Sequence, residues 1–376
     1  MKARWIPAFI FIFIALPALT TAAPSRAQTD GAPRDLLPRH DVRVCAGGDV
    51  TLGTNLDTTW TERMSKWLRR PVPAIPDPRR VLRPLVPLFS DADVALVNVE
   101  GAIGSGPATP KCAVDSRGCF ALRQPPGTAR ALRTLSPRGA VVGNLANNHA
   151  RDAGADGLEV TTALLRRAGV HITGMDTIAT TVVTRAGDTV AFLGFSTSNG
   201  PDPRDIDAVR RHVARAAARY PMLVVTMHLG AEGRTAQRTR DSMETYFDEL
   251  RGNPVAFAHA AVDAGATLVL GHGPHVVRAV EWRNEALIAY SLGNLVTYGP
   301  FSLREPLNRG AILCAVLDSR GRVVRAHLRP TKQRAPGRVS IDRSSRAVIL
   351  ADSLGRIDFP DSGATFVTEA AIRRRR

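Results

Sequence analysis

Short apolar runs that stop at polar residues recur along this chain. Five of them are rich in β-branched and aliphatic side chains and read as buried strands: residues 42–46, 95–97, 140–142, 223–226 and 267–270. Each run is followed by a carboxylate, amide or imidazole side chain. Because the carboxyl ends of parallel strands meet at one edge of an open α/β sheet, we expect these polar side chains to converge there.

The segments between these runs alternate helical and strand-like patterns. Helices are predicted over residues 128–135, 158–168, 207–220 and 257–264. Two hairpins are predicted further along the chain, one across residues 182–195 and one across 311–328, with short edge strands near Val339 and Val348. No internal repeat is present, so the pattern predicts one α/β domain.

The polar residues at the strand ends have the chemistry of a metal site. Asp49 could simply cap the following segment, which is a common role for Asp at a turn. Four further strands that end in similar residues favour a shared site instead. Gly271, Gly273 and Pro274 form a turn that can bring His272 and His275 to one point. Mixed oxygen and nitrogen ligands suit Mn, Zn or Fe. His259, on a predicted helix, is expected to be structural.

The N-terminus has the pattern of an export signal. Lys2 and Arg4 precede an apolar segment over residues 6–19, and Ser25-Arg26-Ala27 offers a cleavage site. An uncleaved anchor is disfavoured because the apolar segment is shorter than the ~20 residues that a membrane span needs. We therefore expect a signal peptide over residues 1–27 and an exported, soluble mature protein. The remaining divisions are a leader at 28–40, the domain at 41–356 and a basic tail at 357–376.

Four cysteines fit an oxidising compartment. Cys112 and Cys119 flank a polar turn and could close a small loop by a disulfide. Cys45 and Cys314 lie in apolar strand-like runs, so we expect them to be buried free thiols. No CxxC pair occurs, which disfavours a structural zinc knot.

The chain is strongly basic, with a formal charge of +16. The first 27 residues carry three basic and no acidic side chains, so +13 remains after cleavage. Such a charge would attract a polyanion, although arginines spread over solvated faces are the simpler explanation. Aromatic residues make up 5% of the chain and do not interleave with a basic stretch, which argues against nucleic-acid binding.

Six motifs occur in an order that resembles the CapA family of poly-γ-glutamate capsule-synthesis proteins. They are GGDVTLGTN, NVEGAI, ANNHARDAGADGLEVT, HLGAEGR, GHGPHVVRAVE and YSLGNLV, and they span roughly residues 42–330. That family resembles the calcineurin-like metallophosphoesterases in fold. The resemblance implies a metallo-dependent phosphatase-like four-layer α/β/β/α sandwich with two mixed sheets.

The resemblance also assigns roles to individual residues. It implies that two divalent ions, of Mn, Zn or Fe, are held by six residues: Asp49, Glu100, Asn148, His228, His272 and His275. It makes His149 the catalytic group that faces the leaving oxygen. Four residues are expected to orient the ligands: Asn147, Asp152, Glu232 and Asn294. Thr51, Gly233 and Arg278 depart from residues usual in these families, and Thr51 replaces a histidine that would complete one metal position.

The implied function is that of an exported protein of capsule or poly-γ-glutamate synthesis with a dinuclear metal site that hydrolyses phosphoester or related bonds. Its expected substrate is an anionic polymer or a phosphoester, and its expected partner is a membrane synthase complex. One alternative is a non-catalytic subunit that holds an anionic polymer for a synthase. Another is a secreted nucleotidase-like enzyme, because fold alone does not fix function.

Overall fold

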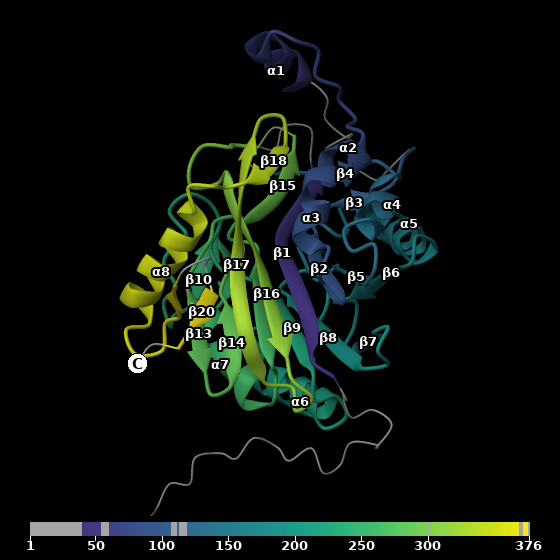
Figure 1. The fold of residues 1–376 in the computed structure, drawn as a ribbon. Coiled ribbons are helices and arrows are strands. Elements are labelled where there is room, and N and C mark those ends of the chain that lie inside the picture. Colours follow the sequence, from purple (N-terminus) through teal and green to yellow (C-terminus); the bar gives the residue numbers. More distant parts are fainter. Residues whose placement is uncertain are drawn as a thin grey trace, which may run out of the picture.

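Two mixed β-sheets lie face to face, with helices on their outer sides (Figure 1). The computed structural model describes residues 40–53, 60–106, 111–112, 119–299, 301–367 and 371–374. The expected signal peptide and nearly all of the leader lie outside these residues. No helix in the described ranges is long and apolar enough to cross a membrane.

The larger sheet has ten strands. Its order is β19 (Thr365–Phe366), β20 (Ala371–Arg373), β17 (Val323–Arg334), β16 (Arg309–Leu317), β1 (Val42–Leu52), β2 (Val94–Val99), β5 (Ala140–Asn144) and β6 (Val170–Thr173). In addition, β15 (Asn294–Tyr298) pairs with β1, and β18 (Arg338–Ile341) pairs with β17. The strands β15, β1, β2, β5 and β6 run parallel, so their carboxyl ends share one edge.

The smaller sheet has six strands. Its order is β13 (Val280–Arg283), β14 (Ala286–Ala289), β12 (Leu268–His272), β9 (Leu223–His228), β8 (Thr189–Ser196) and β7 (Thr180–Val183). The strands β14, β12, β9 and β8 are parallel. Two short pairs complete the strands: β3 (Ala102–Ile103) with β4 (Arg123–Gln124), and β10 (Glu244–Tyr246) with β11 (Glu249–Gly252).

The helices are distributed over both outer faces and one sheet end. They are α1 (Trp60–Leu68), α2 (Pro78–Leu82), the 3₁₀ helix η3 (Arg83–Leu85), α3 (Val86–Phe89), α4 (Thr128–Arg133), α5 (Gly154–Arg167), α6 (Ile206–Ala217), α7 (Pro254–Asp263) and α8 (Arg346–Asp358). Helices α2 to α5 pack on the larger sheet, and α6 and α7 pack on the smaller one.

The core forms three apolar layers because the central strands are buried on both faces. Side chains such as Val44 and Leu96 from the larger sheet meet Val224 and Leu268 from the smaller sheet in the middle layer. Alternate residues of the same strands point outwards to the helices. The α/β class with two mixed sheets is therefore confirmed.

Three local expectations were wrong. Cys45 and Cys314 are not free thiols: they face each other across β1 and β16 and form a disulfide. Val348 lies in α8 rather than in an edge strand. The expected basic tail contributes β19 and β20 to the larger sheet, through pairing of β20 with β17. These outcomes depend on long-range partners that a local pattern does not show. The expected disulfide between Cys112 and Cys119 is present.

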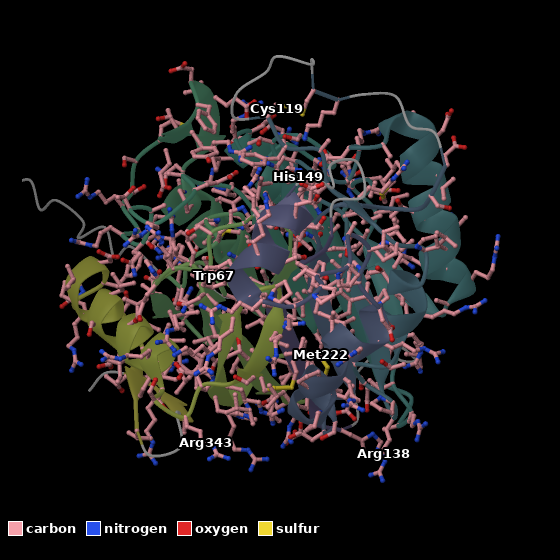
Figure 2. All side chains as sticks on the ribbon, turned by 90° about the horizontal axis from the view of Figure 1, so that it is seen from above. Trp67, Cys119, Arg138, His149, Met222 and Arg343 are labelled. Atoms are coloured by element: carbon pink, nitrogen blue, oxygen red, sulfur yellow. A yellow bond between two sulfur atoms is a disulfide. The ribbon has the colours of Figure 1, made fainter. Side chains whose placement is uncertain are left out.

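The arginines mostly occupy the surface. Arg138 and Arg343, for example, project from the rim of the molecule (Figure 2). For most of the chain, the basic charge therefore comes from arginines spread over solvated faces, which was the simpler explanation.

Candidate metal centre

A bulge in β1 turns Asp49 toward the space between the sheets. Val44 and Ala46 face the middle layer, so strict alternation would point residue 49 outwards. However, Ala46 pairs with Leu96 whereas Asp49 pairs with Asn98, which leaves one extra residue in β1. Gly48 permits this path, because an added Cβ would lie 1.8 Å from the carbonyl oxygen of Gly293.

Polar side chains then form two facing rows at the carboxyl edge. In the larger sheet, Asp49 pairs in register with Asn98, which pairs with Asn144. In the smaller sheet, His228 pairs in register with His272. All five side chains are buried. Asp49, His228 and His272, which the sequence predicted as ligands, are thus brought to the same edge by different sheets.

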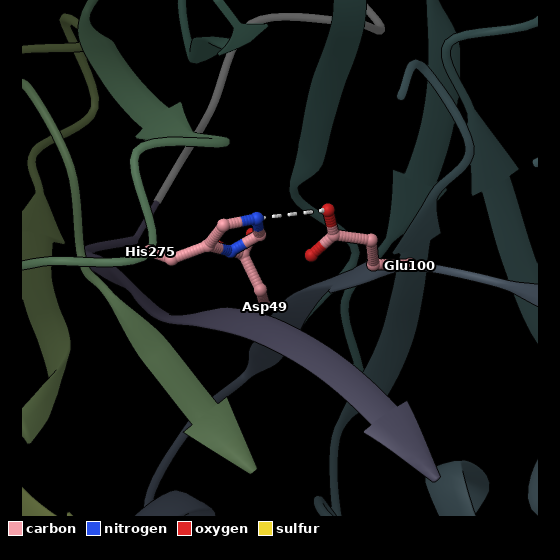
Figure 3. A group of neighbouring side chains, drawn as sticks. All are labelled: Asp49, Glu100 and His275. Carbon is pink, nitrogen blue, oxygen red and sulfur yellow. Dashed lines mark hydrogen bonds and ion pairs between the residues drawn. The ribbon is translucent and has the colours of Figure 1, made fainter. Parts of the chain in front are cut away.

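Short distances connect the two rows. His272 Nδ1 lies 3.6 Å from Asp49 Oδ1, and His275 Nδ1 lies 3.1 Å from Asp49 Oδ2. Glu100 Oε1 lies 3.6 Å from His275 Nε2 and 3.9 Å from His228 Nε2. One ligand atom each of Asp49, Glu100 and His275 lie within 4.8 Å of one another (Figure 3). Five of the six predicted ligands therefore converge.

Glu100 enters the cluster directly after β2. The hydroxyl of Thr51 donates to the backbone carbonyl of Glu100 over 3.0 Å, so the residue that departs from the family pattern supports a ligand instead of supplying one. Both carboxylate oxygens of Glu100 are buried and have no hydrogen-bond partner among the described residues.

The turn after β12 places His275. Gly273 has a φ of 102°, and His275 has a φ of 60°, which is uncommon for a residue with a side chain. A Cβ on Gly273 would lie 3.0 Å from His228 Nε2. Glycine at this position therefore leaves the His228 ring free to approach the cluster.

Burial and mutual charge set the protonation of the cluster. Burial alone would raise the pKa of Asp49, but His272 and His275 outweigh it and hold that pKa well below its usual range. Burial raises the pKa of Glu100 to about 8, against the effect of His275. Burial lowers the pKa of His228 well below its ordinary value, which favours the neutral imidazole that binds metals.

His149 lies beside the cluster in a chain of polar contacts. Its Nδ1 lies 2.6 Å from Asp152 Oδ2, and Lys111 Nζ donates to Asp152 Oδ1 over 2.5 Å. Burial lowers the pKa of His149, against the opposing effect of Asp152. Asp152 thus orients the imidazole, as a residue behind the catalytic group would. His149 is buried, and Figure 2 labels its position.

The two neighbouring asparagines have different surroundings. Asn147 donates to Asn98 Oδ1 over 3.1 Å and accepts from the backbone N–H of His149 over 3.0 Å. Asn148 Oδ1 is buried without a hydrogen-bond partner in the described part of the chain. Asn147 is therefore joined to the cluster through Asn98, whereas the side-chain oxygen of Asn148 has no such connection to the described residues.

Glu232 and Asn294 both contact the turn that carries His275. Glu232 Oε2 lies 3.6 Å from His275 Nε2, and its Oε1 forms an ion pair with the buried Arg251. Asn294 Nδ2 donates to the carbonyl of His275 over 3.2 Å. Both residues therefore contact His275, which is a predicted ligand.

Arg278 holds the loop that precedes Glu232. Its guanidinium is fully buried and donates to both oxygens of Glu244, over 2.9 and 2.8 Å. Glu244 in turn accepts from the backbone N–H of Ala231 over 2.6 Å. The arginine that departs from the family pattern therefore fixes the backbone next to Glu232.

Sequence reasoning missed Asn98, which joins the two sheets at the centre of the cluster. Its Nδ2 donates to Asp49 Oδ1 over 2.8 Å and lies 3.2 Å from His228 Nδ1. Its Oδ1 accepts from Asn144 Nδ2 over 3.0 Å. An amide inside an apolar strand, on the same face as Leu96, was the signal that could have identified it. Arg251 and Lys111 were also missed, and no local pattern marks either one.

The residues present fit a divalent cation. Buried nitrogen and oxygen atoms without hydrogen-bond partners in the described ranges gather here: Glu100 Oε1 and Oε2, His228 Nε2, and His272 Nδ1 and Nε2. Buried polar atoms are normally bonded, so carboxylate and imidazole atoms left unbonded at one point match what a coordinated cation requires. Carboxylate and imidazole donors suit Zn, Mn or Fe.

Comparison with known proteins identifies the family. Residues 43–298 match the family described as bacterial capsule synthesis protein PGA_cap. This chain belongs to that family. Within it, the chain is 27% identical over 183 residues to the PGA biosynthesis protein CapA of Bacillus subtilis (strain 168), and 26% identical over 185 residues to the capsule biosynthesis protein CapA of Bacillus anthracis.

The coverage of these relatives is partial. Each alignment covers 44% of this PGA_cap chain, with 45% of the B. subtilis protein and 42% of the B. anthracis protein. A third relative, the probable polyglutamine synthesis accessory protein of Mycobacterium tuberculosis (strain ATCC 25618 / H37Rv), is 27% identical over 308 residues, which are 68% of this chain and 74% of that protein. This chain thus spans less than half the length of the two CapA proteins.

Two solved structures resemble the PGA_cap chain weakly. A 5'-nucleotidase precursor from Thermus thermophilus is 15% identical with a TM-score of 0.36, over 85% of this chain and 59% of that one. GAP50, the anchor in the inner membrane complex of Plasmodium, is 12% identical with a TM-score of 0.33, over 84% of this chain and 95% of that one. Likenesses this weak assign no function.

Proposed function

We propose that this PGA_cap protein is an exported, metal-dependent hydrolase of capsule or poly-γ-glutamate synthesis that acts on phosphoester or related bonds. The observation that carries the proposal is the convergence of Asp49, Glu100, His228, His272 and His275 between two sheets, with ligand atoms that lack other partners among the described residues. Export is supported by two disulfides, which persist in oxidising compartments.

Different residues of the chain would hold the metal ions and donate a proton. Asp49, Glu100 and the three histidines would hold one or two ions of Mn, Zn or Fe, with Asn148 as a sixth ligand. Bound ions would supply Lewis acidity toward a substrate oxygen. His149, held by Asp152, would face the leaving group and, in its protonated form, would donate a proton to it. Asp49, Glu100, His228 and His272 are buried, which strengthens these interactions, whereas His275 is partly exposed and leaves the group accessible from solvent.

Metal content and turnover test the proposal together. The purified protein is analysed for bound metal and assayed with phosphomonoesters, phosphodiesters and γ-glutamyl peptides. We expect bound Mn, Zn or Fe, and we expect Asp49→Ala and His275→Ala to lose both metal and turnover. His259→Ala is the matched control, because that histidine pairs with Glu281 at a different place. Absence of metal in the unmodified protein would refute the proposal.

The second candidate is a non-catalytic subunit that holds an anionic polymer for a membrane synthase. The net charge of +13 that is expected after cleavage of the signal peptide favours it, because a strongly basic protein attracts polyanions. It predicts polymer binding that weakens as salt rises, with no turnover of any substrate in the panel. Turnover that disappears with the metal would decide against it.

A further inference from the structure

A basic pocket lies away from the candidate metal centre. It has a volume of about 550 Å³ and is lined by four arginines, Arg70, Arg80, Arg83 and Arg338, together with proline side chains, Asp77 and Tyr298. We call it the arginine pocket. Its arginines come from three parts of the chain: the segment after α1, the α2–η3 segment, and β18.

The positive charge of the arginine pocket is not neutralised within the protein. All four arginines are exposed, and none forms an ion pair with any residue that the structure describes. Asp77 is the one carboxylate in the lining, and it is engaged as the N-cap of α2, where it accepts from the backbone N–H of Arg79 over 3.0 Å. A hollow lined by charges of one sign concentrates counter-ions of the other sign.

The fold connects this pocket to the candidate metal centre. The strands β1 and β15 pair in parallel, with Asp49 opposite Asn294 at the centre and Leu52 opposite Tyr298 in the pocket lining. Four residues along a strand span about 13 Å. The candidate centre therefore lies at the start of β15 and the pocket at its end, beside the last residues of β1, so both are within reach of a single extended chain.

The hairpin between β17 and β18 completes the pocket wall. Gly337 has a φ of 98°, and an added Cβ would lie 2.6 Å from the carbonyl oxygen of Thr297. This close approach brings the hairpin against β15 and sets Arg338 beside Tyr298 in the lining. The arginine pocket is therefore built by packing rather than by arginines that happen to be adjacent in sequence.

We propose that the arginine pocket binds the carboxylates of a γ-linked polyglutamate chain and guides that chain toward the metal centre. Planar guanidinium groups bind carboxylates through paired hydrogen bonds, so several arginines around one hollow suit a chain that carries a carboxylate on each residue. The preference for anions follows from the pocket itself, whereas the choice of this polymer rests on the proposed function.

Binding of a labelled oligomer tests the inference. Fluorescence anisotropy is measured with a γ-linked glutamate oligomer and with the uncharged γ-linked glutamine oligomer of the same length. The variant Arg80→Glu/Arg83→Glu reverses two pocket charges. The control Arg166→Glu/Arg167→Glu reverses two exposed charges of α5 outside the pocket, so it changes the net charge equally.

We expect the glutamate oligomer to bind and the glutamine oligomer not to bind. The pocket variant should weaken binding by about tenfold, because two attractions become repulsions, while the α5 control should weaken it by less than about twofold. Binding should also fall at about 1 M salt, where the Debye length is about 3 Å. Asp49→Ala should retain oligomer binding, which separates this pocket from the metal centre.

Three results would overturn the inference: equal weakening by the two double variants, equal binding of both oligomers, or no binding to the unmodified protein. Circular dichroism and thermal unfolding of each variant show that it is folded. The proposed function has its own readout, because metal content is measured without the oligomer. A protein without metal that still binds the oligomer through the pocket would therefore refute the hydrolase proposal and the guidance toward a metal centre, and would support the binding of the oligomer by the arginine pocket.

Discussion

Individual side chains determine whether the predicted ligands can approach one another closely enough to share a site. Asn98 contacts Asp49 in one sheet and His228 in the other, so one amide sets the spacing of two predicted ligands. Gly273 has the opposite role, since its lack of a side chain leaves room for the His228 ring. Residues outside the predicted ligand set thus affect the geometry of the candidate centre.

Replacement of Gly273 tests this control. We expect Gly273→Ala to weaken divalent metal binding by about tenfold, because the new Cβ would press on His228 Nε2. Affinity is measured by competition with a chelator. Gly233→Ala is the matched control: its φ of 97° imposes similar backbone strain, but its Cβ would have no atom within 4 Å. Equal loss of affinity in both variants would contradict the role of Gly273.

At the scale of elements, β1 organises the larger sheet. It pairs with β2, β15 and β16, carries Asp49 at its bulge, and is cross-linked to β16 by the Cys45–Cys314 disulfide. This disulfide joins residues 269 positions apart, whereas Cys112–Cys119 joins residues 7 apart. A cross-link that closes a longer loop restricts the unfolded chain more.

The two disulfides should therefore contribute differently to stability. We expect Cys45→Ala/Cys314→Ala to lower the free energy of unfolding by about 5 kcal/mol, and Cys112→Ala/Cys119→Ala to lower it by about 2 kcal/mol. Guanidinium chloride unfolding followed by circular dichroism measures both. The variant Cys112→Ala/Cys119→Ala is the control, because it also loses a disulfide but one that closes only a short loop. A larger loss in that variant would contradict the expectation.

An acid-sensitive contact ties β1 to β17. Asp91 accepts hydrogen bonds from Arg329 and pairs with Arg43, and these partners lower its pKa from 3.8 to about 2 despite partial burial. A carboxyl whose folded pKa is depressed stabilises the protein above its unfolded pKa, and this stabilisation is lost as pH falls through the folded pKa.

The pH dependence of Asp91→Asn follows from that sign. We expect the variant to be less stable than the unmodified protein above about pH 4, and the difference to shrink toward zero near about pH 2. Urea unfolding at a series of pH values measures the difference. The same difference at both ends of the range would show that the carboxylate charge is not responsible.

At the scale of the whole molecule, the candidate metal centre lies between the two sheets, which also meet through the apolar middle layer and through hydrogen bonds such as that from Thr173 Oγ1 to the carbonyl of Phe192. Asp49 and Glu100 come from the larger sheet and the segment after it, while His228 and His272 come from the smaller sheet. A bound cation would therefore bridge both halves of the fold. The site and the stability of the sandwich are coupled by this arrangement.

Metal binding should stabilise the whole fold. At a free metal concentration of 100 times the dissociation constant, we expect a gain of about 2.7 kcal/mol in the free energy of unfolding relative to protein treated with EDTA. Thermal and denaturant unfolding with and without Mn or Zn measure the gain. Asp49→Ala should show little gain, and an equal gain in that variant would place the stabilising ion elsewhere.

The α/β class with two mixed sheets and five residues of the candidate site could be predicted from the sequence. Strands buried on both faces leave continuous apolar runs, and the polar residue after each run marks the carboxyl edge, as with His228 and His272. The role of Asn98 was not predicted, because it depends on a contact with His228, which lies 130 residues away in the sequence. The C-terminal strands were not predicted for the same reason, because β20 joins the larger sheet through its pairing with β17.

The sequence by itself determined which chemical groups stand at the ends of the strands, because an apolar run and the polar residue that follows it are local features. The tertiary structure alone decided that the two edges face each other, that Cys45 lies opposite Cys314, and that arginines from three parts of the chain surround one pocket. The physical reason is that these proximities arise from the packing of two sheets, and packing depends on surfaces that are assembled only when distant segments of the chain come together.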